Sequence, residues 1–129
     1  MILYIAIGSA IGGVARYLLA SYLQSRFGAS FPVGTLVVNV TGSFVLMVLL
    51  QYSLTTPAIS AEIRALLTTG FCGGYTTFST FSYETVRLIE DGDWRRAGWY
   101  VAASVILAVG GAFAGLVVTR NVLAAGRAA

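Results

Sequence analysis

The stretch TTFSTFSYE contains two kinds of side chain that could contact an ion. In a helix successive residues are about 100° apart, so Thr77, Thr80 and Glu84 share one face. Phe78 and Phe81 fall on another face. Lipid contact or core packing would explain an isolated pair of phenylalanines. Hydroxyl residues on both sides of the rings instead favour an ion pathway, because hydroxyl groups and ring edges both present partial positive charge.

Two other apolar segments carry polar side chains at helical spacing. Thr35, Asn39 and Ser43 are four residues apart and form one stripe, in which the amide of Asn39 needs the most hydrogen-bond partners. Tyr100 and Ser104 are also four residues apart. Hydrogen bonding between helices would explain any one of these residues. A whole stripe favours a lined path, since polar groups in hydrocarbon must find partners or face water.

The composition places these residues in a membrane. Hydrophobic residues make up 57% of the 129 residues and charged residues only 10%, whereas soluble domains carry about 25% charged residues. There is no histidine and no lysine, which removes the commonest metal ligand and Schiff-base chemistry and argues against an enzyme. A net charge of +3 is too small to indicate nucleic-acid binding. We therefore expect a single domain, residues 1–129, embedded in a lipid bilayer.

Charged and turn-forming residues divide the chain into four pieces, each long enough to cross the ~30 Å hydrocarbon core as a helix. The predicted spans are about 2–23, 32–52, 61–88 and 96–119. Ser60 is a plausible N-cap for the third span. The sequence thus predicts an all-α integral membrane protein with four transmembrane helices.

Glycines interrupt the third predicted span and also pair in two others. Gly70, Gly73 and Gly74 each weaken a helix by about 1 kcal/mol relative to alanine, so we expect a break there. A break frees backbone carbonyls, and broken helices in transport proteins use such carbonyls to hold cations. Pairs at four-residue spacing, Gly8 with Gly12 and Gly111 with Gly115, predict close helix contacts.

Arg16 lies well inside the first predicted span. Its long side chain could reach the nearer interface, or it could form a fixed cation in a vestibule that attracts anions. The sequence leaves both readings open.

The arginines give almost no orientation signal. The termini and the second loop carry three of them, and the first and third loops carry four. Insertion in both orientations would allow an antiparallel homodimer.

Three motifs resemble the Fluc/CrcB fluoride channels. They are GFCGGYTTFSTFS in the third span, GTLVVNVTG in the second, and the G-x-x-x-R of Gly12 to Arg16 in the first. The resemblance covers essentially the whole chain. It implies a dual-topology homodimer of antiparallel subunits in the bacterial inner membrane, with two pores that pass fluoride passively and so reduce its toxicity.

The resemblance also implies roles for individual residues. The positions that match the family's pore are Phe78, Phe81, Asn39, Tyr100 and Ser104, with a hydroxyl track at Thr35, Thr77, Thr80 and Glu84. A structural sodium ion at the dimer centre would be held by the backbone carbonyls of Gly73 and Thr76, and its charge would lie near both pores.

Other classes of membrane protein remain as alternatives. A small dual-topology proton-coupled exporter would need a membrane-embedded carboxylate, typically early in the chain. The first span has no acid, and Glu84 is the only candidate. A non-transporting assembly subunit would leave the polar stripes without a purpose.

Overall fold

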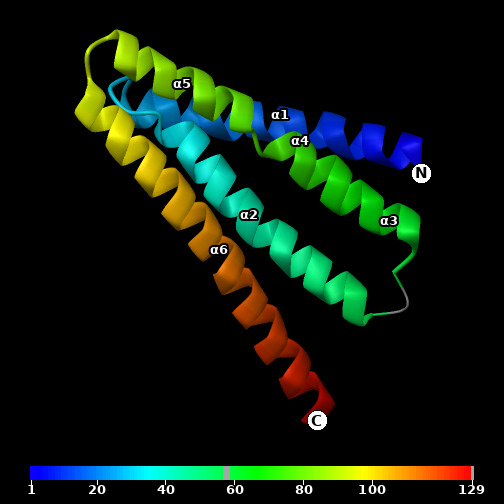
Figure 1. The fold of residues 1–129 in the computed structure, drawn as a ribbon. Helices are drawn as coiled ribbons and strands as arrows, with labels where there is room; N and C mark the ends of the chain where they lie inside the picture. Colours follow the sequence, from blue (N-terminus) through cyan, green and yellow to red (C-terminus); the bar gives the residue numbers. More distant parts are fainter. Residues whose placement is uncertain (57–58, 129) are drawn as a thin grey trace.

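The computed structural model describes residues 1–56 and 59–128, and every regular element in them is helical. The elements are α1 (Ile2–Phe27), α2 (Val33–Thr55), α3 (Ala61–Ala65), the π-helix η1 (Leu66–Cys72), α4 (Gly73–Tyr75), α5 (Phe78–Glu90) and α6 (Trp94–Ala128). Figure 1 shows α2 and α6 side by side, with α3 to α4 running along α1. The loop after α1 and the turn after α5 lie at the same end.

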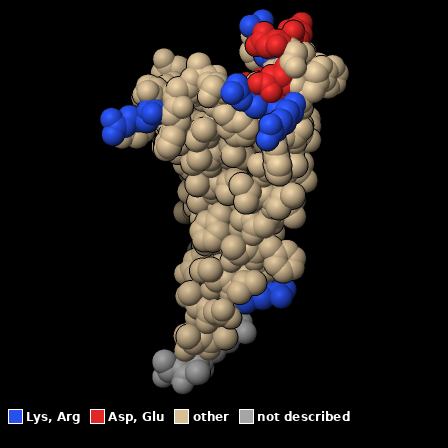
Figure 2. Space-filling view, turned by 90° about the vertical axis from the view of Figure 1, so that its left-hand side faces the viewer, with Lys and Arg blue, Asp and Glu red and all other residues tan. Residues whose placement is uncertain are grey.

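Three of these helices are long and apolar enough to cross a membrane, namely Ile2–Phe27, Val33–Thr55 and the Trp94–Gly126 part of α6. A single chain buries few of its large apolar side chains, and most of those on α1 and α6 are exposed. In Figure 2, most charged side chains gather at one end of the visible face, a basic side chain lies toward the other end, and the broad surface between them is uncharged. This distribution suits a surface that meets lipid or another protein.

The first and fourth predicted spans are shorter than the observed helices. α1 continues to Phe27 and ends at Gly28, whose φ of 81° favours glycine. α6 begins at Trp94, where Asp93 Oδ1 accepts from the backbone N–H of Arg96 at 3.1 Å. It continues past Arg120 because that region is rich in helix formers. The charged residues therefore mark where the apolar part of each helix ends, but the helix itself continues past them.

Glycines let α1 lie against the backbone of η1 and α4. A Cβ added at Gly8 would overlap the carbonyl oxygen of Leu66, and one added at Gly12 would overlap that of Phe71. Gly115 plays the same part between α6 and α2, because its added Cβ would lie 2.7 Å from the carbonyl oxygen of Phe44. The predicted close contacts at both glycine pairs are confirmed, since a Cβ at Gly111 would also lie 3.0 Å from Val40 O.

Residues 61–90 leave helical geometry after the glycines and not at them. Ser60 caps the start, since its side chain accepts from the N–H of Ile63 at 3.3 Å. Gly73 is helical, with φ −65° and ψ −37°. Thr76 and Thr77 are extended: the ψ angle of Thr76 is 159°, and the φ angle of Thr77 is −153°. The expectation that the glycines themselves break the helix is therefore wrong.

The glycines serve packing instead. An added Cβ at Gly70 would lie 2.9 Å from Ile5 O, and one at Gly74 would lie 2.5 Å from Ser9 O. Both positions are thus needed for the close approach of α1. The hydroxyl of Ser9 also donates to Gly70 O at 3.4 Å. Glycine, which has a low helix propensity, occupies these positions because no larger residue would allow α1 to approach so closely.

Candidate ion pathway

Asn39 on α2 clamps the extended residue Thr77. Its Nδ2 donates to Thr77 O at 3.0 Å, and its Oδ1 accepts from Thr77 N at 2.8 Å. Both backbone groups of Thr77 are thereby satisfied without a helix, as buried backbone requires. The Thr77 hydroxyl then accepts from the N–H of Thr80 at 3.2 Å and starts α5. One side chain therefore fixes the interruption and the start of the next helix.

Glu84 on α5 is tied to α2 and α6. Thr35 Oγ1 donates to its Oε1 at 2.9 Å, and the Tyr100 hydroxyl donates to its Oε2 at 2.6 Å. Thr35 is 5% exposed and Tyr100 is fully buried. Hydrogen bonds to a charged acceptor are short and strong. These bonds bring three of the predicted site residues together from three helices.

Aromatic rings pack against both sides of Tyr100. Its ring centroid lies 5.2 Å from that of Phe81, which lies 5.3 Å from that of Phe78. On the other side, Phe31 meets Tyr100 edge to face at 5.5 Å. Phe78 is 78% exposed in the single chain. Phe31 was not predicted as a site residue, because it precedes α2 and lies outside any periodic stripe.

An open groove of about 310 Å³ lies between α2, α5 and α6. None of the described residues that line it is charged: Asn39, Ser43, Leu46, Thr76, Thr77, Phe78, Phe81, Ser104, Val105, Ala108 and Val109. Within the described part of the chain, the buried Ser104 Oγ has no hydrogen-bond partner. Ser43 Oγ, by contrast, donates to Asn39 O at 2.7 Å. Ser104 is therefore a buried, unpaired polar residue in the lining of the groove.

A second cavity, of about 230 Å³, lies at another face of α5, against α1. Its lining includes Arg16, Thr35, Thr77 and Thr80. Arg16 Nη1 donates to Thr76 O at 3.4 Å, so its side chain points to the interruption and not to an interface. The Thr77 hydroxyl donates to Thr80 Oγ1 at 3.0 Å, which leaves the Thr80 proton free to bind another acceptor. The predicted residues therefore line two faces of α5.

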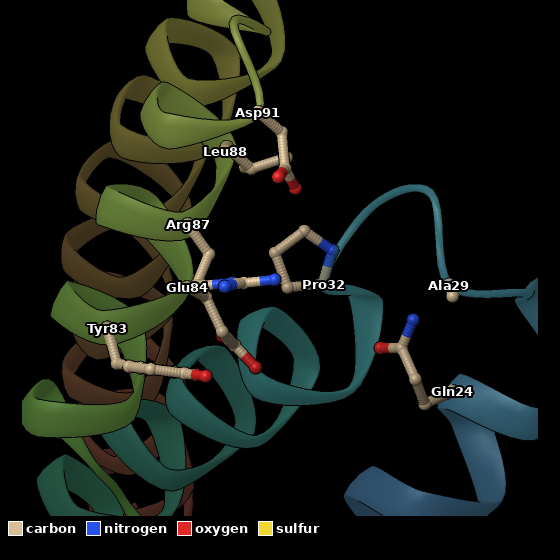
Figure 3. A pocket seen from close by; sticks show the side chains of 8 residues that line it. All are labelled: Gln24, Ala29, Pro32, Tyr83, Glu84, Arg87, Leu88 and Asp91. Carbon is tan, nitrogen blue, oxygen red and sulfur yellow. The ribbon is translucent and has the colours of Figure 1, made fainter.

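A third cavity, of about 340 Å³, opens where the α1–α2 loop meets α5 (Figure 3). Gln24 shapes its rim: its Nε2 donates to Phe31 O at 3.0 Å and to Gly28 O, and its Oε1 accepts from Gly34 N at 3.4 Å. Sequence reasoning missed Gln24. A glutamine one turn before a glycine that ends a helix was the available signal.

Gly73 O and Thr76 O have the donor chemistry that a sodium ion requires, although Thr76 O already accepts from the Arg16 guanidinium at 3.4 Å, so a sodium ion there would lie near a second positive charge. In a continuous helix Gly73 O would accept from Thr77 N, but that N–H donates to Asn39. Hard cations prefer such oxygen ligands. Two carbonyls are too few for a full shell, so water or a second chain would have to supply the remaining oxygens. Among residues 1–56 and 59–128 no group of three acidic, cysteine or histidine side chains offers a different metal site.

Three apolar helices of membrane length, with an uncharged polar groove beside two of them, define a multi-pass membrane protein. A family profile described as "CrcB-like protein, Camphor Resistance (CrcB)" matches residues 3–116. The chain therefore belongs to the CrcB family.

Relatives in this family have names that describe ion channels. The chain is 49% identical over 120 residues to the "Fluoride-specific ion channel FluC" of Geobacter sulfurreducens, covering 93% of this chain and 97% of that protein. It is 47% identical over 120 residues to the protein of the same name from Geobacter metallireducens, with the same coverage. The protein of that name from Roseiflexus sp. is 46% identical over 119 residues, covering 92% and 96%.

Proposed function

We propose that this protein is a fluoride-selective channel through which fluoride leaves the cell down its gradient, so that fluoride toxicity falls. The relatives' names support fluoride as the ion. The observation that carries the proposal is the uncharged groove with the unpaired Ser104 hydroxyl beside Asn39, Phe78 and Phe81. An anion can bind there to weak donors, and none of the described residues that line the groove has a cationic side chain.

The groove suits passage of a small, strongly hydrated anion. Such an ion needs replacements for lost water, and Ser104, the free amide proton of Asn39 and the edges of Phe78 and Phe81 supply them. Each donor is weak, and conduction requires sites that are favourable but not too tight. The Thr80 hydroxyl adds one more donor on the other face of α5. Thr35 and Tyr100 hold the Glu84 carboxylate in a fixed position near the path.

The channel is proposed to be an antiparallel homodimer with two pores in the inner membrane. Residues 61–88 form its third span, interrupted at Thr76 and Thr77. The exposed Phe78 ring supports a partner chain, because the ring lines the groove yet is uncovered in one copy. The near-equal arginine count supports insertion in both orientations.

The proposed sodium ion lies between the two copies, held by the carbonyls of Gly73 and Thr76. When bound, it supplies a fixed positive charge near both pores. Replacing sodium by N-methylglucamine on both sides is expected to abolish fluoride flux and to lower the thermal midpoint of the dimer, since a ligand that binds only the native state stabilises it. Restoring sodium is expected to reverse both changes. Unchanged flux and an unchanged midpoint would exclude an essential ion at this site.

Phe81→Ile is expected to reduce fluoride flux about tenfold or more, because isoleucine fills the space without a positive ring edge and loses about 1 kcal/mol of aromatic contact. The dimer should remain assembled by size-exclusion chromatography. Phe113→Ile is the matched control, since that ring is exposed on α6 outside the groove. Wild-type flux in Phe81→Ile would remove the ring from the mechanism.

Fluoride efflux from liposomes, followed with a fluoride electrode, separates the channel from a proton-coupled exporter. A channel empties the liposomes without a pH gradient once potassium with valinomycin balances the charge. An exporter requires the gradient and stops in Glu84→Gln. Efflux that depends on a proton gradient would therefore overturn the proposal.

A further inference from the structure

The third cavity has a charge pattern that the proposed conduction path does not yet explain. Its charged lining residues are Glu84, Arg87 and Asp91, and its neutral ones include Gln24 and Tyr83. Glu84 and Arg87 are three positions apart and share one face of α5, and Asp91 directly follows the last residue of that helix. Figure 3 shows the Arg87 side chain extended between the two carboxylates, toward Pro32 at the start of α2.

Arg87 is the one cation among these lining residues. Its Nη1 lies 4.0 Å from Glu90 Oε2, and both side chains are more than half exposed. Such a loose, solvated pair is weak and does not use up the charge of Arg87. Without Arg87, the lining would carry two carboxylates and no cation.

The cavity adjoins the proposed pathway through Glu84. The same carboxylate that faces the cavity accepts hydrogen bonds from Thr35 and Tyr100, and Tyr100 packs on Phe81. The residues that line the cavity lie at the end of the helix bundle where the α1–α2 loop and the α5–α6 turn come together (Figure 1). Most charged side chains of the visible face are at this end (Figure 2). Glu84 is thus the residue that connects this cavity to the groups of the proposed pathway.

We propose that Arg87 is a charge-balancing residue at the channel mouth, which offsets Glu84 and Asp91 and so prevents depletion of fluoride there. The inference rests on the proposed fluoride conduction. A mouth with uncompensated negative charge repels anions over roughly a Debye length, about 30 Å at 0.01 M salt and 3 Å at 1 M. The role is electrostatic, so it needs a cation at this position and no particular hydrogen bond.

The test is the unitary fluoride current in planar bilayers of neutral lipid. Currents of wild type, Arg87→Gln, Arg87→Lys and the double variant Arg87→Gln/Asp91→Asn are compared at about 20 mM sodium fluoride, alone and with about 1 M sodium gluconate. Arg87→Gln is expected to reduce the current about two- to fivefold at low ionic strength and to match wild type at high ionic strength. Arg87→Lys should keep the wild-type current, and Asp91→Asn should restore most of what Arg87→Gln loses.

Arg120→Gln is the matched control, because Arg120 is exposed, does not line the cavity, and lies 26 residues beyond Trp94 on α6, roughly 39 Å along the helix and so beyond the screening length. Its current should equal that of wild type in both solutions. A wild-type current in Arg87→Gln at low salt would overturn the proposal. So would an equal loss at both ionic strengths without rescue by Asp91→Asn, which would mark a structural role. Absence of fluoride current in the wild type would instead overturn the proposed function itself.

Discussion

Replacing Asn39 by alanine is expected to abolish fluoride conduction. The substitution removes the donor to Thr77 O and the acceptor from Thr77 N. Each backbone group left unsatisfied inside a membrane protein costs about 1–3 kcal/mol. We expect the extended residues to change conformation, which would move Phe78 and Phe81 at the start of α5. The groove would also lose the amide of Asn39 itself.

Asn39→Asp separates the effect of losing the hydrogen bonds to Thr77 from the effect of losing the neutral amide in the groove. The carboxylate keeps an acceptor for Thr77 N but loses the donor to Thr77 O, and it places a negative charge beside the proposed anion path. We expect this variant to assemble and still to pass no fluoride. Liposome efflux measures the flux, and a thermal unfolding midpoint measures the stability.

Ser53→Ala serves as the control for Asn39. Ser53 is also a mostly buried polar residue on α2, but its hydroxyl donates only within its own helix, to Leu50 O at 3.0 Å. Flux and midpoint should stay at the wild-type level. If Asn39→Ala also conducted at the wild-type rate, neither the clamp nor the amide would be part of the channel.

Gly12→Ala is expected to prevent stable folding. The new Cβ would overlap the carbonyl oxygen of Phe71 and lie 2.9 Å from Tyr75 N. These are backbone atoms, so they cannot move away as a flexible side chain would. Overpacking a core costs about 1–3 kcal/mol and more where the neighbours are rigid, and α1 would have to separate from η1 and α4. The yield of monodisperse protein in detergent and its thermal midpoint measure the effect.

The adjacent Gly13→Ala provides an internal control. Nothing lies within 4 Å of a Cβ added at Gly13. Alanine has the higher helix propensity, so this variant should be as stable as wild type or up to about 1 kcal/mol more stable. Equal midpoints for the two variants would contradict the close backbone contact between α1 and η1.

The helical class and the glycine contacts could be read from the sequence because both leave periodic signals. The length of the apolar runs predicts membrane-length helices, and Gly8 and Gly12 recur at the spacing of one helix face. The break was misplaced, because a glycine that allows close packing and a glycine that ends a helix look the same in one sequence. The deciding partner, Asn39, lies 38 residues away from Thr77.

The candidate site was predicted as separate residues and not as a set of contacts. Thr35, Glu84 and Tyr100 were each expected in the pore, but their mutual hydrogen bonds join residues 49 and 16 positions apart, which periodicity cannot reveal. Phe31 and Arg87 were missed as site residues for another reason. Phe31 precedes a helix. Arg87 is an exposed arginine near the end of a helix, where charged side chains are usually only solvated.

The reversal potential with sodium fluoride on one side of a bilayer and sodium chloride on the other tests selective, passive fluoride conduction most directly. At equal pH on the two sides, we predict a fluoride current whose reversal potential moves with the fluoride gradient and is unaffected by chloride. A reversal potential near zero with equal concentrations of fluoride on one side and chloride on the other would show that the protein does not select fluoride. In a second experiment with unequal pH, a reversal potential that follows the pH gradient would show coupling to protons. Either result would contradict the proposed channel.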